Sequence, residues 1–168
     1  MGVDAIGGAG IELEPLPPWL QRICDELTRC GIFPPDAPPN HVLLNEYQIG
    51  QGIAAHKDGP LYAPRVAILS LGSHATFEFS TPSTPSAPSE TVASMLLPPR
   101  GVFVFGGDAY KSHLHGIKGK AADDTASPGL VCLDRQAAAD GADEHGLLPR
   151  RRRLSLTVRR VRRWYDRD

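Results

Sequence analysis

A histidine and an aspartate lie two positions apart in the tripeptide His56-Lys57-Asp58. Side chains two residues apart in an extended segment point to the same side, so the imidazole and the carboxylate would project together. Such a pair supplies two of the three ligands of a 2-His-1-carboxylate triad, which binds Fe(II) on one face and leaves open positions for other ligands. A surface loop can carry the same tripeptide by chance, so the pair alone does not define a metal site.

The third ligand of such a triad would be a histidine on a neighbouring strand. His113 and His115 both lie in the segment HLHGI and would face the same way in a strand, so spacing does not choose between them. The preceding apolar segment contains Gly106 and Gly107, which permit a close approach of the backbone to a site.

The segment RLSLTVR near the C-terminus alternates strictly between polar and apolar residues. If its polar face is exposed to solvent, the segment is an ordinary half-buried edge strand. If that face lines a barrel, two arginines could bind an elongated dianion, because guanidinium groups form paired, charge-assisted hydrogen bonds with carboxylates. The polar face consists of Arg153, Ser155, Thr157 and Arg159, and the apolar face of Leu154, Leu156 and Val158.

An earlier segment repeats this pattern. Asn45 and Tyr47 would share one face of a strand, with Leu44 on the opposite face. Both polar side chains could form hydrogen bonds with the same anion. Tyr47 could equally be a core aromatic residue and Asn45 a turn residue, and the sequence leaves both interpretations open.

Together, these motifs resemble the AlkB-like Fe(II)/2-oxoglutarate-dependent dioxygenases. The resemblance covers roughly residues 14–162 and is particularly close to the eukaryotic branch called AlkB homologue six over residues 39–79 and the LHGI segment. The interval between Asp58 and His115 also matches. The motifs, in the family's order, are Asn45-x-Tyr47, His56-x-Asp58, His115-Gly116-Ile117 and Arg153-x-Ser155-x-Thr157-x-Arg159.

The resemblance implies the identity of the metal ligands. His56, Asp58 and His115 would bind Fe(II), and the Gly-Ile pair that follows His115 favours this histidine over His113.

The resemblance also implies a site for the cosubstrate 2-oxoglutarate. Arg153 would form a salt bridge with its distal carboxylate, assisted by Tyr47. Asn45 and Arg159 would contact the end nearer to the metal. The family often carries Asn where this chain has Ser155, so one cosubstrate hydrogen bond is expected to differ. The predicted cosubstrate-binding residues are Asn45, Tyr47, Arg153, Ser155, Thr157 and Arg159.

The elements that would position these residues follow from the spacing of apolar side chains. Helical spacing predicts one helix over residues 15–31, with Gly31 as a stop signal, and a period of two begins at Asn40. One helix followed by many short strands predicts a mainly β protein with an N-terminal helical flank, and the resemblance specifies a double-stranded β-helix (jelly roll). The predicted strands are 41–48, 65–71, 75–80, 92–97, 101–105, 129–133 and 154–161.

Other segments have compositions typical of irregular structure. Residues 80–91 are rich in Ser, Thr and Pro, and residues 118–149 are rich in Ala, Asp and Gly around one short strand, so both are expected to be mobile insertions. We expect disorder over residues 1–13 and a tail over residues 164–168, which leaves residues 14–163 as the oxygenase domain.

The overall composition sets further limits. A chain of 168 residues, 41% hydrophobic and 22% charged, is typical of one globular domain and not of a disordered protein. No apolar run approaches the ~20 residues of a membrane span, and the N-terminus has no signal-peptide pattern. Cys24, Cys30 and Cys132 lack metal-site spacing and predict buried, reduced thiols in an intracellular protein. The resemblance implies a location in the nucleus or the cytoplasm, or in both.

The charges are distributed unevenly. Residues 149–168 contain nine arginines against Asp166 and Asp168, whereas the remainder of the chain is net acidic. A basic stripe of this density could face phosphates or another anion, but its position at the end of the chain favours a solvated strand and tail for most of these arginines.

Three functional interpretations follow. The resemblance implies an enzyme that uses Fe(II), 2-oxoglutarate and O2 for oxidative demethylation or dealkylation of nucleic acid, with weak support from the arginine-rich end. The same chemistry on a protein side chain and a non-catalytic metal- or nucleic-acid-binding protein on this fold are the alternatives. Family members carry a further N-terminal region that helps to form the substrate-facing lid. This chain starts late relative to them, so we expect substrate recognition to be the most affected function.

Overall fold

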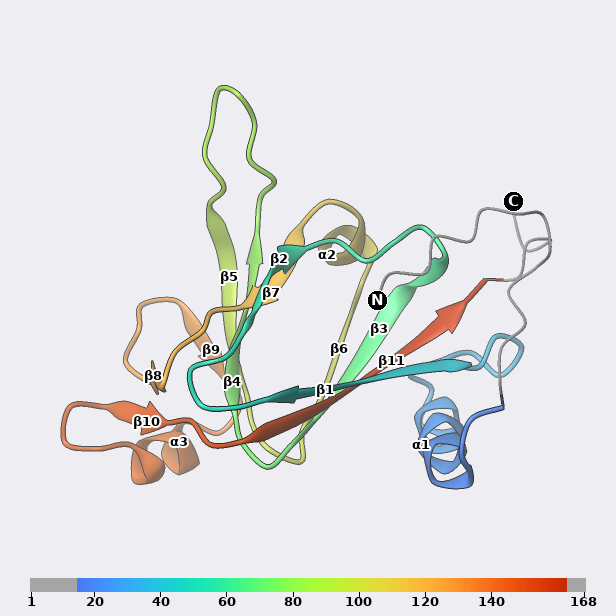
Figure 1. Ribbon diagram of the computed structural model, residues 1–168, viewed down its shortest axis with the longest axis horizontal. Coiled ribbons are helices and arrows are strands. Elements are labelled where there is room, and N and C mark those ends of the chain that lie inside the picture. Colours follow the sequence, from blue (N-terminus) through green and yellow to red (C-terminus); the bar gives the residue numbers. More distant parts are fainter. Residues whose placement is uncertain (1–14, 163–168) are drawn as a thin grey trace.

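The computed structural model describes residues 15–162 of the chain (Figure 1). The predictions for residues 1–13 and 164–168 lie outside this range. The helices are α1 (Pro18–Arg29), α2 (Gly107–Lys111) and α3 (Arg135–Gly141). The strands are β1 (His41–Tyr47), β2 (Ile53–His56), β3 (Tyr62–Leu71), β4 (Ala75–Ser80), β5 (Thr91–Leu97), β6 (Val102–Gly106), β7 (Leu114–Ile117), β8 (Ala122–Asp124), β9 (Leu130–Cys132), β10 (Leu147–Pro149) and β11 (Arg153–Val161).

Two sheets form the body of the protein. One has the strand order β1-β11-β3-β6 and the other has the order β2-β7-β4-β5-β9, while β8 and β10 form a separate pair. The last strand, β11, lies between β1 and β3, so residues far apart in the sequence are direct neighbours. This mainly β, jelly-roll architecture confirms the predicted fold class.

The main core fills the space between the two sheets. Val66 and Phe105 come from the first sheet, and Phe77, Phe79 and Ile117 come from the second, and all five belong to one cluster of buried side chains. The rings of Phe79 and Phe105 meet edge to face with their centres 5.3 Å apart, an arrangement that aromatic pairs favour. This aromatic core holds the two sheets together.

Helix α1 covers the outer face of the first sheet. Pro18 stands at the start of the helix, where its missing N–H costs nothing, and Gly31 follows the end of the helix with a φ of +74°. Leu27 packs against Ala67 of β3 and Val158 of β11 in a second buried cluster. Because Val158 faces α1, the neighbouring Arg159 must face the space between the sheets.

Residues 81–90 form a hairpin that continues β4 and β5 and projects away from both sheets (Figure 1). The Thr81 N–H donates to the Glu90 carbonyl at 2.9 Å, and Thr84 and Ala87 form a bridge near the tip. The Thr81 hydroxyl also accepts the Glu90 N–H at 3.0 Å. Apart from this bridge, residues 81–90 carry no strand or helix, as expected of an insertion rich in Ser, Thr and Pro, and their hydroxyl groups bond to their own backbone. Their mobility stays a prediction.

The segment 118–149, in contrast, carries more regular structure than expected. Beyond β9, which was predicted, it contains β8, α3 and β10. Asp134 caps α3 by accepting the Ala137 N–H at 2.9 Å, which is the usual role of an aspartate at a helix start. Ala138 of this helix packs on Leu96 of β5 and on Leu130 of β9. The expectation of a long loop around one short strand was therefore wrong, since this small cluster stabilises the segment.

The three cysteines are all free thiols, as predicted, but only Cys24 is buried. Burial, with the nearby Asp25 carboxylate, raises the pKa of the Cys24 thiol to about 11. Cys30 is exposed at the end of α1, and Cys132 is half-buried, so the prediction of burial was wrong for these two. Within residues 15–162, no helix is both long enough and apolar enough to cross a membrane.

Candidate metal and cosubstrate site

His56, Asp58 and His115 meet in space. Their candidate ligand atoms all lie within 4.8 Å of one another. His56 ends β2 directly opposite His115 on β7, and Asp58 follows two residues later in the loop to β3. The ring centres of the two histidines are 4.5 Å apart. Two imidazoles and one carboxylate at this separation match the donor set of an Fe(II) facial triad.

The orientation of His56 suits metal binding. Its Nδ1 lies 2.8 Å from the Ala54 carbonyl oxygen, which can only accept a hydrogen bond, so Nδ1 carries the proton. The lone pair of Nε2 is then free for a metal. A backbone carbonyl that holds the other ring nitrogen is the common support of a histidine ligand.

His115 is buried within the aromatic core. Its ring stacks on Phe77 at 5.6 Å between centres and lies 5.0 Å from the Phe105 ring centre. Burial, and then the proximity of His56, lower the pKa of His115 to about 4, although the Asp58 carboxylate opposes this shift. The imidazole is therefore neutral at pH 7, which is the form that binds metals.

His113 lies apart from this cluster. It precedes the first residue of β7, and its Nδ1 lies 3.1 Å from the Asp108 carbonyl oxygen of α2. Because β7 begins at Leu114, His113 lies outside the strand and does not share a strand face with His115. The geometry thus separates two histidines that spacing alone left equivalent.

Arg159 lies at the metal end of β11. Its Nη1 donates to Asp58 Oδ1 at 2.6 Å, and its side chain is buried. This bond leaves the second oxygen of Asp58 free for a metal. The guanidinium also lies over the ring of Tyr62, 4.2 Å from its centre.

Arg153 lies at the opposite end of β11 and is only 3% exposed. Its Nη2 donates to the Ser70 hydroxyl at 2.8 Å, but Nε and Nη1 have no hydrogen-bond partner within the described part of the chain. Its guanidinium carbon is 5.6 Å from the centre of the Tyr47 ring. Burial lowers the pKa of Arg153, and the nearby Arg150 charge adds to this shift. A buried cation with unsatisfied donors is costly without an anion, so these residues fit a bound carboxylate.

The remaining predicted cosubstrate residues lie between the two arginines. Asn45 pairs with Ser155 across β1 and β11, and Thr157 pairs with Leu43. Ser155 is buried, with its hydroxyl 3.5 Å from Arg153 Nη2. Ser155 and Thr157 lie on the face of β11 opposite Val158, as the alternation predicted, and Asn45 lies beside Ser155 on β1. Their contacts with a cosubstrate stay a prediction.

Sequence reasoning missed a buried polar network beyond Arg153. Arg150 donates two hydrogen bonds to Asp123 of β8, each 2.6 Å long, and His74 Nε2 lies 3.3 Å from the same carboxylate. Arg150 was predicted to belong to a solvated stripe, but it is 6% exposed. No sequence signal pairs these residues, because Asp123 lies in a segment without clear periodicity.

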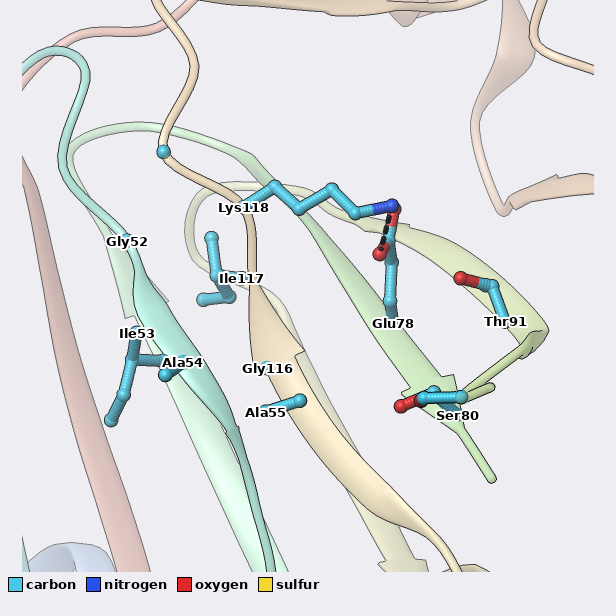
Figure 2. Close-up of a pocket in the computed structure, with 12 residues that line it drawn as sticks. Gly52, Ile53, Ala54, Ala55, Glu78, Ser80, Thr91, Gly116, Ile117 and Lys118 are labelled. Atoms are coloured by element: carbon cyan, nitrogen blue, oxygen red, sulfur yellow. Dashed lines mark hydrogen bonds and ion pairs between the residues drawn. The ribbon is translucent and has the colours of Figure 1, made fainter. Parts of the chain in front are cut away.

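A groove with a volume of about 470 Å³ lies on the other side of the second sheet (Figure 2). Its walls are the backbone of residues 52–55 and 116–119 and the side chains at the ends of β4 and β5. Lys118 spans part of it and pairs with Glu78 at 2.7 Å. Because Gly116 and Glu78 alternate with inward-facing His115 and Phe77, this groove is separate from the metal cluster.

Comparison with known proteins places the chain in a family. Residues 9–159 match the 2OG-Fe(II) oxygenase superfamily. The chain is 37% identical over 159 residues to "Probable RNA/DNA demethylase ALKBH6" of Danio rerio, covering 90% of this chain and 65% of that protein. It is 29% identical to "tRNA (carboxymethyluridine(34)-5-O)-methyltransferase ALKBH8" of Macaca fascicularis, covering 89% of this chain and 22% of that protein.

The fold has a counterpart among solved structures. The structure of OsALKBH1 superposes with a TM-score of 0.51 at 19% identity, covering 86% of this chain and 64% of that one. These matches confirm the predicted AlkB-like resemblance, and the family implies the predicted use of Fe(II), 2-oxoglutarate and O2. The chain spans slightly less than two thirds of the Danio rerio relative and of OsALKBH1. The chain belongs to the 2OG-Fe(II) oxygenase superfamily.

Proposed function

We propose that the chain is an Fe(II)/2-oxoglutarate-dependent dioxygenase that removes methyl or other alkyl groups from nucleic acid by oxidation. One observation carries the proposal: a single strand, β11, presents Arg159 to the metal cluster at one end and the unsatisfied, buried Arg153 at the other. This arrangement supports a small dianion held between the metal and the far end of the barrel.

Each residue of the site has a defined task in this proposal. When bound, Fe(II) and 2-oxoglutarate supply the oxidation of a substrate C–H bond by O2. His56, Asp58 and His115 hold the metal, and Arg153 binds the distal carboxylate through its two free nitrogen donors. The aromatic residues around His115 exclude water from one side of the metal.

Unpaired cations near the metal cluster support a nucleic acid substrate. Lys57 lies between two of the ligands, and its Nζ donates to the Lys111 carbonyl at 3.0 Å. Lys57, Lys111 and Arg162 are exposed, and none of them forms an ion pair with a residue in the range 15–162. Exposed cations bind phosphate groups and position a nucleic acid without reading its sequence.

The names of the relatives agree with this substrate class. The Danio rerio protein is called an RNA/DNA demethylase, and the Macaca fascicularis protein is called a tRNA methyltransferase. By extension, we propose a nuclear or cytoplasmic location, where such substrates occur.

The test combines cosubstrate turnover with substrate mass. The purified full chain would be titrated with Fe(II) and 2-oxoglutarate without oxygen, and then exposed to O2 with panels of methylated oligonucleotides and methylated peptides. We expect succinate release coupled to loss of a methyl group from a nucleoside, and no coupled turnover in a His115→Ala variant. Coupling to a peptide instead would make the substrate a protein. Metal binding without succinate release would make the chain a non-catalytic binding protein.

A further inference from the structure

The Arg159 guanidinium lies between a metal-ligand carboxylate and an aromatic ring. On one side its Nη1 donates to Asp58 Oδ1 at 2.6 Å, and on the other its central carbon lies 4.2 Å from the centre of the Tyr62 ring. Arg159 is 5% exposed, and its Nε has no hydrogen-bond partner among residues 15–162. Besides the single bond to Asp58, the Tyr62 ring is therefore the main contact that fixes the plane of this guanidinium.

A β-bulge brings Tyr62 to this position. Arg159 pairs with Val66 of β3, so a regular ladder would pair Val161 with Pro64. The register shifts between these positions, and Val161 pairs with Tyr62 instead. The two extra residues of β3 remove a proline, which has no N–H, from the ladder and direct the aromatic side chain towards Arg159.

Tyr62 is in turn supported by a residue of β1, on the other side of β11. His41 of β1 pairs with Arg159 across the sheet, and its ring lies 5.4 Å from the Tyr62 ring centre at an angle of 51°. The Tyr62 hydroxyl makes no hydrogen bond to any residue in the described range, so only its ring contacts this cluster. A continuous series of contacts thus runs from His41 through Tyr62 and Arg159 to the metal ligand Asp58.

We propose that Tyr62 is a positioning residue of the metal centre. Its ring holds Arg159 in the orientation that occupies one oxygen of Asp58, which leaves the other oxygen free to bind the metal. A cation over an aromatic face in a desolvated site is strongly attracted to the ring. The inference rests on the proposed metal site, and it assigns to Tyr62 a task that none of the site motifs includes.

The test measures metal affinity in the absence of turnover. Titration of the full chain with Co(II) or Fe(II) under anaerobic conditions, followed by absorption or calorimetry, gives the dissociation constant directly. Tyr62→Leu removes the ring and should weaken metal binding by about tenfold, the lower end of the range found when an outer partner of a metal ligand is lost, because the ring acts through Arg159. Tyr62→Phe keeps the ring and should retain the affinity of the natural chain within about threefold.

A double-mutant cycle separates positioning from a general structural effect. In an Arg159→Met background, Tyr62→Leu should add little further loss, because the ring then has no guanidinium to hold. If Tyr62→Leu fails to fold, Tyr62→Met replaces it, because the flexible methionine side chain fills irregular space. Phe33→Leu removes an aromatic ring from the separate cluster beneath α1, so it serves as the control and should leave metal affinity unchanged.

The possible outcomes separate this inference from the proposed function. Unchanged affinity in Tyr62→Leu, equal losses in Tyr62→Leu and Tyr62→Phe, or fully additive losses with Arg159→Met would each overturn the positioning role. In all three cases the natural chain still binds the metal. If the natural chain binds no metal, the proposed function fails as well.

Discussion

Arg150 and Asp123 form a buried, two-pronged ion pair: Nε and Nη2 of the arginine donate to the two carboxylate oxygens, each at 2.6 Å. Arg150 also donates to the Lys118 carbonyl at 2.8 Å. The pair joins β8, within the segment 118–149, to the chain three residues before Arg153. The pair therefore attaches this segment to the Arg153 end of the candidate cosubstrate site, away from the metal cluster.

Replacing Asp123 by Asn should lower the free energy of unfolding by about 3–5 kcal/mol. The substitution leaves the Arg150 charge buried without a counter-charge, and this is the costly way to break a buried pair. Denaturant unfolding of both proteins measures the difference. The matched control is Glu46→Gln, which breaks the exposed pair between Glu46 and Arg152 at 2.6 Å. An exposed, solvent-screened pair contributes little to stability, so similar losses in the two variants would contradict the prediction.

The same carboxylate should make stability depend on pH in the acid range. Burial alone would raise the pKa of Asp123, but hydrogen bonds from Arg150, His74 and Thr76 hold it well below its ordinary value of 3.8. A carboxyl group with a depressed pKa in the folded state stabilises the fold above its unfolded pKa, and this contribution is lost as the pH falls. The free energy of unfolding should therefore decrease below about pH 4, and more steeply in the natural chain than in Asp123→Asn. If the free energy of unfolding falls equally in the two proteins between pH 5 and pH 2, Asp123 is not the source of this pH dependence.

Arg153→Ala should weaken 2-oxoglutarate binding at least ~tenfold and leave Fe(II) affinity almost unchanged. Removal of one partner of a buried, hydrogen-bonded charge pair costs about 2–5 kcal/mol, and Arg153 lies at the end of β11 away from the metal cluster. Calorimetric titration of the anaerobic protein measures both affinities. Arg151→Ala is the matched control, because Arg151 is exposed two residues earlier. Equal, small effects of the two substitutions would mean that Arg153 does not bind the cosubstrate.

Asp58→Ala should abolish stoichiometric metal binding, whereas His113→Ala should leave it intact. Asp58 belongs to the cluster whose ligand atoms lie within 4.8 Å of one another, and His113 does not. Metal content after dialysis and anaerobic Fe(II) titration measure the effect. Normal binding by Asp58→Ala together with loss of binding by His113→Ala would reverse the assignment of the ligands.

Much of the fold could be predicted because strand periodicity depends only on neighbouring residues. The alternation along 153–159 predicted that the arginines and the apolar residues lie on opposite faces of β11, and Val158 does pack beneath α1. The short strands β2 and β7 were missed, since four residues are too few to show a period and part of their stability comes from pairing with each other. The organisation of 118–149 was missed for a related reason: β8, β10 and α3 are stabilised by contacts with each other and with β5, not by their own composition.

The sequence by itself determined the residue types of the site, the family, and that the two arginines share one side of their strand, because these depend on local spacing and on the order of motifs. Spacing left His113 and His115 equivalent and the resemblance favoured His115, while the tertiary structure gave the physical reason, since His113 lies before the start of β7. It also decided that Tyr62 lies beside Arg159, because a bulge shifts the register of β3. The pairing of Arg150 with Asp123 was likewise a result of packing. Contacts of this kind join residues whose separation along the chain carries no periodic signal, and the register of distant strands brings them together.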